Sequence, residues 1–273
     1  MSQSNYYSLA SPTSLLLDDS QIIDRIFSHI DNKTTDLGSE VWREPVKNYV
    51  DQERFNKEIK LLRSQPVPFC PSSALPEKGS YVSRIAAGTP ILVTRDEENN
   101  VNAFINACRH RGMQVASGSG CKKSFICPYH GWTYGLKGEN RNIPGSDGFP
   151  GVDPLEHGLK QINAVEKGGI VYVCQDGEIH KKFLDEALDY FTDEQALINQ
   201  SEIEDQANWK ILHETLLEGY HIKTLHKDTF FPYGLDNINV VENYGQNSRV
   251  IFPFRRIEKL RDVDPGSRVI DGT

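Results

Sequence analysis

The sequence predicts an α+β fold in which a β-rich middle region stands between helical segments, and three observations predict it. Apolar residues recur at helical spacing over residues 12–31. Short runs rich in β-branched and aromatic residues follow, from Tyr81 to about Gly177. Helical patterns then return and lead into a two-strand pattern. The 273 residues, 38% of them hydrophobic, suffice for one large domain or two ordinary ones.

The N-terminal region is predicted to contain two helices. In residues 12–31, Thr13 or Ser14 can cap the first helix, and its apolar residues are Leu16, Leu17, Ile22, Ile23, Ile26, Phe27 and Ile30. A second helix is expected from Pro45 to Arg63, because proline suits a first turn. Four prolines between Gln65 and Pro76 argue against a regular element, so that segment is interpreted as a linker or a crossing strand.

The middle region is predicted to be a small all-β unit. Its strand-like runs are TPILVTRD, VNAFINAC, KSFICPY and GGIVYVCQ, and it ends near Asp176-Gly177. Helices are expected at about Ile179–Phe191 and Trp209–Tyr220. The final pattern predicts two strands joined at Gly245-Gln246-Asn247, as a hairpin.

Composition and charge exclude several classes of protein. The 38 acidic and 30 basic residues give a formal net charge of −8, and no dense Lys/Arg cluster points to nucleic acid. No apolar run approaches the ~20 residues of a membrane span, and the N-terminal sequence lacks the basic region of a signal peptide. Five cysteines without a secretion signal disfavour a disulfide framework. We therefore expect a soluble, cytoplasmic protein that binds neither nucleic acid nor a membrane.

The first constellation of candidate ligands consists of two Cys/His pairs. Cys108-x-His110 and Cys127-x-x-His130 are separated by 16 residues. Two tight loops of this kind can enclose tetrahedral zinc or a mixed-ligand iron–sulfur cluster, and two hairpins with incidental Cys and His are the remaining alternative. Zinc fingers usually place both Cys in one pair, whereas a cluster with thiolates on one iron and imidazoles on the other needs mixed pairs. The other cysteines fit neither loop: Cys121 is interpreted as a free thiol, and Cys70 and Cys174 as packing residues.

The second constellation contains Glu218, His221 and His226. On a helix over Trp209–Tyr220, Glu218 would share a face with Glu214, and His221 would lie near that face. Two imidazoles at this spacing could hold one iron, with a carboxylate completing a two-His-one-carboxylate site. A carboxylate beside a metal-bound histidine, as Glu218 is beside His221, is also the usual group that fixes its tautomer. Packing or surface histidines are the alternative interpretation.

Together these residues resemble the α subunit, or terminal oxygenase, of Rieske non-haem iron oxygenases of the aromatic-ring-hydroxylating type. The residues around the first constellation match the family's Rieske pattern: Arg109, Gly112, Pro128, Tyr129, Gly131, Trp132 and Tyr134. Around the second, Asn208-Trp209-Lys210, Glu214 and Glu218-x-Tyr220-His221-x4-His226 match its iron site, and His213 lies off the pattern. The resemblance covers about residues 40–260.

The resemblance implies a fold and a domain order. It implies a small all-β Rieske [2Fe-2S] domain and an incomplete helix-grip catalytic domain, an antiparallel sheet with helices. The expected division is an N-terminal helical segment 1–44, a Rieske domain 45–178, and the N-terminal part of the mononuclear-iron domain 179–273.

The resemblance also implies cofactors and partners. Cys108, His110, Cys127 and His130 are expected to hold the [2Fe-2S] cluster, and His221 and His226 a mononuclear Fe(II). Electrons are expected from NAD(P)H through a separate reductase or ferredoxin. The full-length protein is expected to form a homotrimer in which Glu218 bridges an iron histidine to a neighbouring subunit's cluster histidine, the counterpart of His130.

The implied reaction uses O2 to hydroxylate, dihydroxylate or demethylate a small organic substrate, aromatic or quaternary ammonium. Ring-dihydroxylating members commonly have aspartate at the bridging position, and Glu218 instead resembles the branch that oxidises quaternary ammonium compounds. Aromatic residues after the second histidine, Phe230, Phe231 and Tyr233, are interpreted as core residues or as the wall of an apolar pocket.

The third iron ligand of the family, a downstream aspartate, has no match in the sequence. The remaining aspartates after His226 are Asp228, Asp236, Asp262 and Asp264, and none stands in a matching context. The chain is therefore expected to be C-terminally truncated. An electron-transfer Rieske protein or an inactive fragment is the second functional hypothesis, and a zinc-stabilised module is the third.

Overall fold

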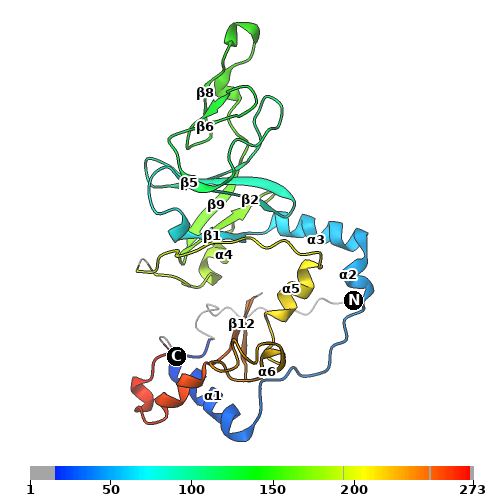
Figure 1. The fold of residues 1–273 in the computed structure, drawn as a ribbon, viewed down its shortest axis with the longest axis vertical. Coiled ribbons are helices and arrows are strands. Elements are labelled where there is room, and N and C mark those ends of the chain that lie inside the picture. Colours follow the sequence, from blue (N-terminus) through cyan, green and yellow to red (C-terminus); the bar gives the residue numbers. More distant parts are fainter. Residues whose placement is uncertain (1–15, 193, 246, 271–273) are drawn as a thin grey trace. The chain divides into compact units, whose positions relative to one another are not determined.

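The computed structural model describes residues 16–192, 194–245 and 247–270, and its mixture of helices and antiparallel sheets confirms the predicted α+β class (Figure 1). The chain forms two compact units. One comprises the described residues of 52–203, and the other comprises those of 1–51 and 204–273. In the parts of the chain that are described, no helix has both the length and the apolar character needed to traverse a membrane.

An antiparallel sheet forms the centre of the unit 52–203. Its spatial order is β1-β10-β9-β4-β3-β2-β5. The strands are β1 (Val67–Pro71), β2 (Ser80–Ala86), β3 (Thr89–Arg95), β4 (Val101–Ile105), β5 (Gly118–Cys121), β9 (Gln161–Lys167) and β10 (Ile170–Cys174). The sequence pattern correctly predicted β3, β4 and β10.

The proline-rich segment Gln65–Pro76 contains a regular element after all. It forms β1 and a short 3-10 helix, η2 (Ser72–Ala74), so the crossing-strand alternative is the correct one. Prolines are tolerated because β1 lies at the edge of the sheet and pairs only with β10, with an irregular register between Pro68 and Cys70.

A second, three-stranded sheet carries one of the candidate ligand loops. It consists of β6 (Phe125–Ile126), β7 (Thr133–Tyr134) and β8 (Asn140–Asn142), followed by the 3-10 helices η3 (Ser146–Gly148) and η4 (Pro154–Glu156). The predicted run KSFICPY contains β6. Phe104 of β4 packs close to Gly138, in the turn between β7 and β8, and this contact brings the two sheets together.

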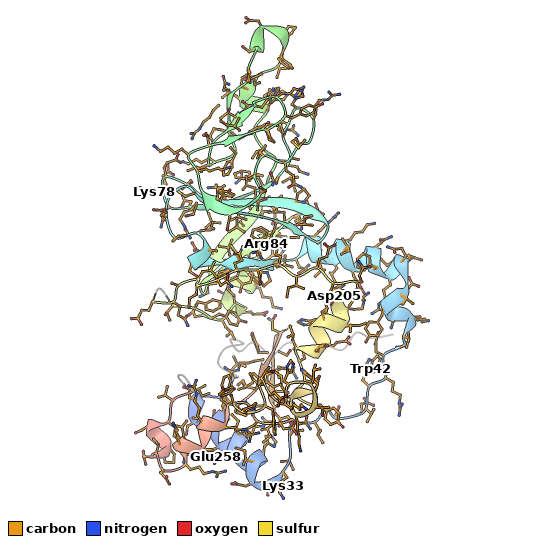
Figure 2. The ribbon with its side chains drawn as sticks, viewed as in Figure 1. Lys33, Trp42, Lys78, Arg84, Asp205 and Glu258 are labelled. Atoms are coloured by element: carbon orange, nitrogen blue, oxygen red, sulfur yellow. The ribbon has the colours of Figure 1, made fainter. Side chains whose placement is uncertain are left out.

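The N-terminal helices differ from the expectation in their ends. Helix α1 covers Asp19–Asn32 and is capped by Asp18 in a capping box with Gln21, because their side chains satisfy each other's backbone N–H groups. The expected caps, Thr13 and Ser14, lie outside the described residues. Lys33, labelled in Figure 2, ends the helix in a left-handed conformation.

The expected helix over Pro45–Arg63 is two helices. They are α2 (Lys47–Val50) and α3 (Gln52–Ser64), and Asp51 between them has an extended backbone. Of the apolar residues expected on the first helix, Leu16 and Leu17 precede α1. The buried residues of α1 pack against Val240 and Ile257; they are Ile22, Ile23, Ile26 and Phe27.

The C-terminal helices are shorter than expected. Helix α4 covers Lys181–Glu186, because the backbone of Tyr190 and Phe191 instead donates to Gly168 in the β9–β10 turn. The remaining elements are α5 (Trp209–Thr215), α6 (Ile222–Leu225), β11 (Val240–Tyr244), β12 (Asn247–Ile251), η5 (Arg255–Leu260) and η6 (Pro265–Ser267). The antiparallel pairing of β11 with β12 confirms the predicted hairpin, although Gln246 in its turn lies outside the described residues.

Candidate metal centres

Two loops with matching backbones carry the first four candidate ligands. Loop 1, Cys108–Met113, follows β4, and loop 2, Cys127–Trp132, joins β6 to β7. In each loop the cysteine N–H donates to the carbonyl five residues ahead, at 2.7 and 2.8 Å. A glycine N–H, from Gly112 or Gly131, donates back to the cysteine carbonyl at 2.9 and 3.0 Å. Both glycines have φ 76°, a conformation that strongly favours glycine.

The four side chains form an inner pair and an outer pair. Cys108 and Cys127 are 4% and 2% exposed. His110 is half-buried and His130 is exposed, and their ring centroids lie 4.6 Å apart. This arrangement suits a two-iron cluster with two buried thiolates on one iron and two outer imidazoles on the other.

His110 supplies a test of whether these residues fit such a cluster. Its Nδ1 is buried and has no hydrogen-bond partner in the described structure, which is costly for a polar atom unless a ligand satisfies it. Burial, together with the nearby charges of His130 and Arg111, lowers the pKa of His110 and so favours the neutral imidazole that binds metal. The orphaned nitrogen and the buried thiols therefore fit the cluster.

Aromatic rings surround His110. The Trp132 ring is stacked parallel to it, with centroids 5.2 Å apart and an interplanar angle of 7°. The Phe149 ring meets His110 edge-on at 5.7 Å and Trp132 at 5.9 Å. Phe149 ends the short 3-10 helix η3 and belongs to no sequence motif, so its place beside His110 could not be predicted from the sequence.

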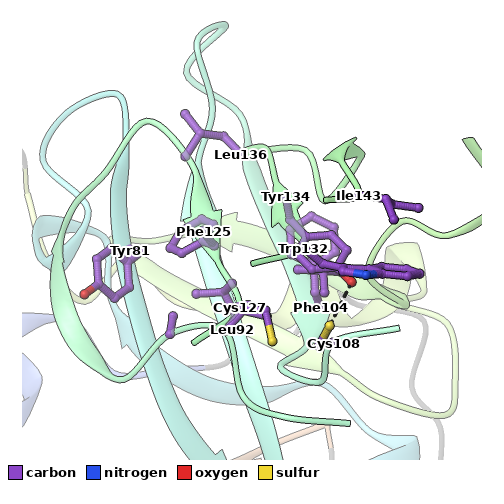
Figure 3. Close-up of a cluster of buried hydrophobic side chains, with 13 residues drawn as sticks. Tyr81, Leu92, Phe104, Cys108, Phe125, Cys127, Trp132, Tyr134, Leu136 and Ile143 are labelled. Carbon is purple, nitrogen blue, oxygen red and sulfur yellow. Dashed lines mark hydrogen bonds between the residues drawn. The ribbon is translucent and has the colours of Figure 1, made fainter. Parts of the chain in front are cut away.

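Tyr134 connects the second sheet to loop 1. Its hydroxyl accepts a hydrogen bond from the Arg109 backbone N–H at 2.9 Å and lies 3.2 Å from Cys108 Sγ (Figure 3). A thiolate has no proton to donate, so the tyrosine is the donor once Cys108 is ionised. Burial first, and then the contact with Cys108, raises the pKa of Tyr134 and keeps the hydroxyl protonated.

Asn106 is a second residue that sequence analysis missed. It is fully buried, and its Nδ2 donates to Ser83 Oγ and to the Ala116 carbonyl, both at 2.8 Å. Its Oδ1 accepts from the backbone of Val115 and Ala116. The Asn106 side chain thus fixes the backbone that precedes and follows loop 1. The one sequence feature that could have indicated this role is a polar residue directly after the apolar strand β4.

The second constellation brings Glu218, His221 and His226 together. The Glu218 carboxylate accepts a very short hydrogen bond from His221 Nδ1, and the ring centroids of His221 and His226 are 5.3 Å apart. His226 Nδ1 lies 3.5 Å from Thr229 Oγ1. Burial raises the pKa of Glu218, but hydrogen bonds from His221 and from the Tyr220 backbone outweigh it, so the net pKa is lowered.

The helix that was expected to position these residues ends too early. Helix α5 stops at Thr215, not Tyr220, so Glu214 and Glu218 do not share one helical face. Glu214 instead accepts from the Tyr49 hydroxyl at 2.9 Å. The Glu218 side chain captures the backbone N–H groups of Tyr220 and His221, which competes with helix continuation. His221 and His226 then flank the separate short helix α6.

The described residues do not bring a third ligand to these histidines. Within residues 16–192, 194–245 and 247–270, no group of three or more His, Cys, Asp or Glu side chains is arranged to hold a single metal ion. Asp228 is highly exposed beside Lys227, and Asp236 accepts from the Lys223 backbone. This finding concerns a single ion with three or more protein ligands. It does not bear on a two-iron cluster, in which each iron takes only two protein ligands.

Comparison with known families and proteins identifies both regions. Residues 65–163 match the family described as Rieske [2Fe-2S] domain, and residues 193–266 match the one described as Ring hydroxylating alpha subunit (catalytic domain). Choline monooxygenase of Spinacia oleracea is 29% identical over 65% of this chain and 45% of that protein. The glycine betaine monooxygenase oxygenase subunit of Chromohalobacter salexigens is 33% identical over 56% of this chain and 36% of that protein.

A solved structure shows a similar fold. The quaternary ammonium Rieske monooxygenase CntA, in complex with an inhibitor, superposes with a TM-score of 0.68 at 22% identity, over 79% of this chain and 62% of that one. The chain spans less than half the length of the two curated relatives named above.

Proposed function

Because the chain belongs to the family of Rieske non-haem iron oxygenase α subunits, we propose that it works as the terminal component of an oxygenase for a small quaternary ammonium compound. The observation that carries the proposal is the succession of two sites in one chain, the paired Cys/His loops and then the Glu218–His221–His226 group. Similarity to choline and glycine betaine monooxygenases supports the substrate class.

Each side chain has a defined task in this proposal. Cys108 and Cys127 hold one iron of the cluster, and His110 and His130 hold the other. The bound cluster supplies single electrons, and a mononuclear iron at His221 and His226 supplies O2 activation. Glu218 accepts a hydrogen bond from the Nδ1–H of His221 and so fixes the tautomer that leaves Nε2 free to bind metal.

Glu218 has the exposure that an inter-subunit bridge requires. Its side chain is 44% exposed although it already contacts His221, so a carboxylate lone pair stays accessible to a second imidazole. His130 is exposed as well. We propose that in a homotrimer Glu218 accepts a hydrogen bond from the neighbouring subunit's counterpart of His130 and so conducts electrons between the two sites.

The electron donor is proposed to be a separate reductase or ferredoxin with an acidic surface. Residues 99–138 carry both cluster loops and contain five Lys or Arg residues and no Asp or Glu, in a chain of net charge −8. Among the described residues, Arg109, Arg111, Lys122 and Lys123 are exposed and form no ion pair. This basic surface would attract an acidic partner to the cluster.

Iron and acid-labile sulfide, measured per chain on protein purified without air, test the proposal. We expect three irons and two sulfides, one cluster plus one mononuclear iron. The double variant His221→Ala/His226→Ala should retain two irons and two sulfides. His213→Ala is the matched control, since His213 is an exposed histidine on neighbouring α5 and should leave the count at three.

The other outcomes separate the alternative functions. Two irons and two sulfides in the unaltered protein would favour an electron-transfer role, because the cluster would form without the second metal. Absence of sulfide from a folded sample, with zinc in its place, would overturn the oxygenase proposal. Substrate-dependent O2 uptake with trimethylammonium compounds then tests the reaction itself.

A further inference from the structure

The two candidate cluster histidines have unequal surroundings. His110 is half-buried among aromatic rings, with Trp132 stacked on it and Phe149 edge-on at 5.7 Å. His130 is exposed, and the Tyr129 ring that stacks on it is itself 54% exposed. The backbones of loops 1 and 2 match, so the difference arises from the side chains that cover each loop. One imidazole edge of the proposed cluster is therefore covered, and the other is open to solvent.

The cover over His110 comes from residues 144–156, which we call the covering segment. It contains the 3-10 helices η3 and η4. Phe149 and Val152 are half-buried and pack against the core cluster that includes Cys108 and Trp132. The other residues of the covering segment are exposed. Phe149 and Val152 therefore anchor a segment that is otherwise surrounded by solvent.

The backbone of the covering segment stands clear of the rest of the described structure. An added Cβ would meet no heavy atom within 4 Å at any of three of its glycines, Gly145, Gly148 and Gly151. At its start the segment contacts loop 2, because a Cβ at Gly131 would lie 3.2 Å from the Pro144 ring. The covering segment thus runs from loop 2 to His110, and the Phe149 side chain, not the backbone, makes the contact with that imidazole.

A cover of this kind changes the reduction potential through solvation. With two thiolates and two neutral imidazoles, the oxidised cluster is formally neutral and the reduced cluster carries one negative charge. Water stabilises that charge, and apolar surroundings penalise it. Exclusion of water from the His110 edge therefore disfavours the reduced state and lowers the potential.

We infer that Phe149 is a positioning residue that holds the His110 imidazole against Trp132 and closes this edge of the cluster to water. The inference rests on the proposed function and deepens it, because it assigns control of the cluster's potential to a residue outside both ligand loops. His130, on the uncovered edge, is left as the imidazole that solvent and other proteins can reach.

Reduction potentials of the metal-loaded full chain, from redox titration followed by EPR at one pH, test the inference. Phe149→Ala should raise the ratio of reduced to oxidised cluster about tenfold at a fixed ambient potential, which is about 59 mV in a one-electron couple. Phe149→Leu keeps a large apolar side chain and should restore most of the original potential. Leu155→Ala is the matched control, since Leu155 lies on the covering segment but is 89% exposed, and its potential should equal that of the unaltered protein.

A second measurement reports water at the cluster directly. Electron spin-echo modulation of the reduced protein in D2O detects exchangeable deuterons near the irons. Their signal should be stronger in Phe149→Ala than in the unaltered protein, and it should be unchanged in Phe149→Leu and Leu155→Ala. Phe149→Val, a milder truncation, should shift both readouts in the same direction by less, and it supplies the same test if Phe149→Ala does not retain the cluster.

Several results would overturn the inference. They are an unchanged or lowered potential in the truncated variants, an equal rise in Leu155→Ala, and failure of Phe149→Leu to restore the potential. Iron and sulfide content separates these results from failure of the proposed function. Absence of sulfide from the unaltered protein would overturn both, whereas a cluster whose potential does not depend on residue 149 would overturn this inference alone. Circular dichroism of each variant confirms that it is folded.

Discussion

At the scale of single residues, Tyr134 is expected to raise the reduction potential of the proposed cluster. Its hydroxyl lies 3.2 Å from Cys108 Sγ in a buried environment. A hydrogen bond to a cluster sulfur stabilises the more negative, reduced state and so raises the reduction potential. Tyr134→Phe should therefore lower the potential by on the order of 40 mV, equivalent to one hydrogen bond of about 1 kcal/mol in a one-electron couple.

Redox titration of the cluster by EPR or circular dichroism measures this shift. Tyr129→Phe is the matched control, because Tyr129 stacks on His130 at 3.8 Å while its hydroxyl has no hydrogen-bond partner in the described structure. The reduction potential of the cluster in Tyr129→Phe should equal that of the unaltered protein. An unchanged potential in Tyr134→Phe would show that the hydroxyl does not contact the cluster sulfur.

The candidate metal ligands could be predicted from the sequence, whereas the residues that pack around them and hold their loops in place could not. Cys108, His110, Cys127 and His130 have distinctive types and spacing, and the structure brings them together as two related loops. Asn106 and Phe149 were missed because their roles depend on partners distant in the chain, such as Ser83 for Asn106. A single buried amide or aromatic side chain has no spacing pattern from which such a role could be predicted.

At the scale of elements, the turn between β7 and β8 depends on Gly138. It has φ 79°, and a Cβ there would lie 2.4 Å from the Phe104 ring of β4. Gly138→Ala should therefore lower the free energy of unfolding by about 2–4 kcal/mol, from left-handed backbone strain and overpacking. Urea unfolding of the metal-loaded protein, followed by fluorescence, measures the change.

Gly148→Ala is the control for that turn. Gly148 lies in the 3-10 helix η3, has no positive φ, and has nothing within 4 Å of an added Cβ. The free energy of unfolding of Gly148→Ala should stay within about 1 kcal/mol of that of the unaltered protein. Equal effects of the two substitutions would contradict the proposed packing of Phe104 on this turn.

Strands were easier to predict than helix ends in this chain. Runs such as TPILVTRD are short and rich in β-branched residues, a composition that favours a strand, and β3 lies within that run. Helix α5 ended five residues early because Glu218 binds the local backbone N–H groups. That competition involves side-chain hydrogen bonds, which a periodicity of apolar residues does not reveal.

At the scale of the whole molecule, charge is distributed unevenly. The net charge is −8, whereas residues 99–138 contain only basic charges. The acidic remainder of the chain would repel the proposed acidic electron donor and this basic surface would attract it, so we expect the encounter to be steered toward the cluster loops. Rising salt screens both effects.

We therefore expect cluster reduction by an acidic ferredoxin-type donor, followed by stopped-flow absorbance, to slow as ionic strength rises. The double variant Lys122→Glu/Lys123→Glu should lower the second-order rate constant about tenfold at low salt and weaken its salt dependence. Lys57→Glu/Lys60→Glu makes the same charge change on α3, outside the basic stretch, and should have little effect. An equal loss in both variants would mean that total charge, not its position beside the cluster, governs the encounter. Unchanged cluster absorbance in each variant ensures that the rate reports association, because neither pair contains a ligand.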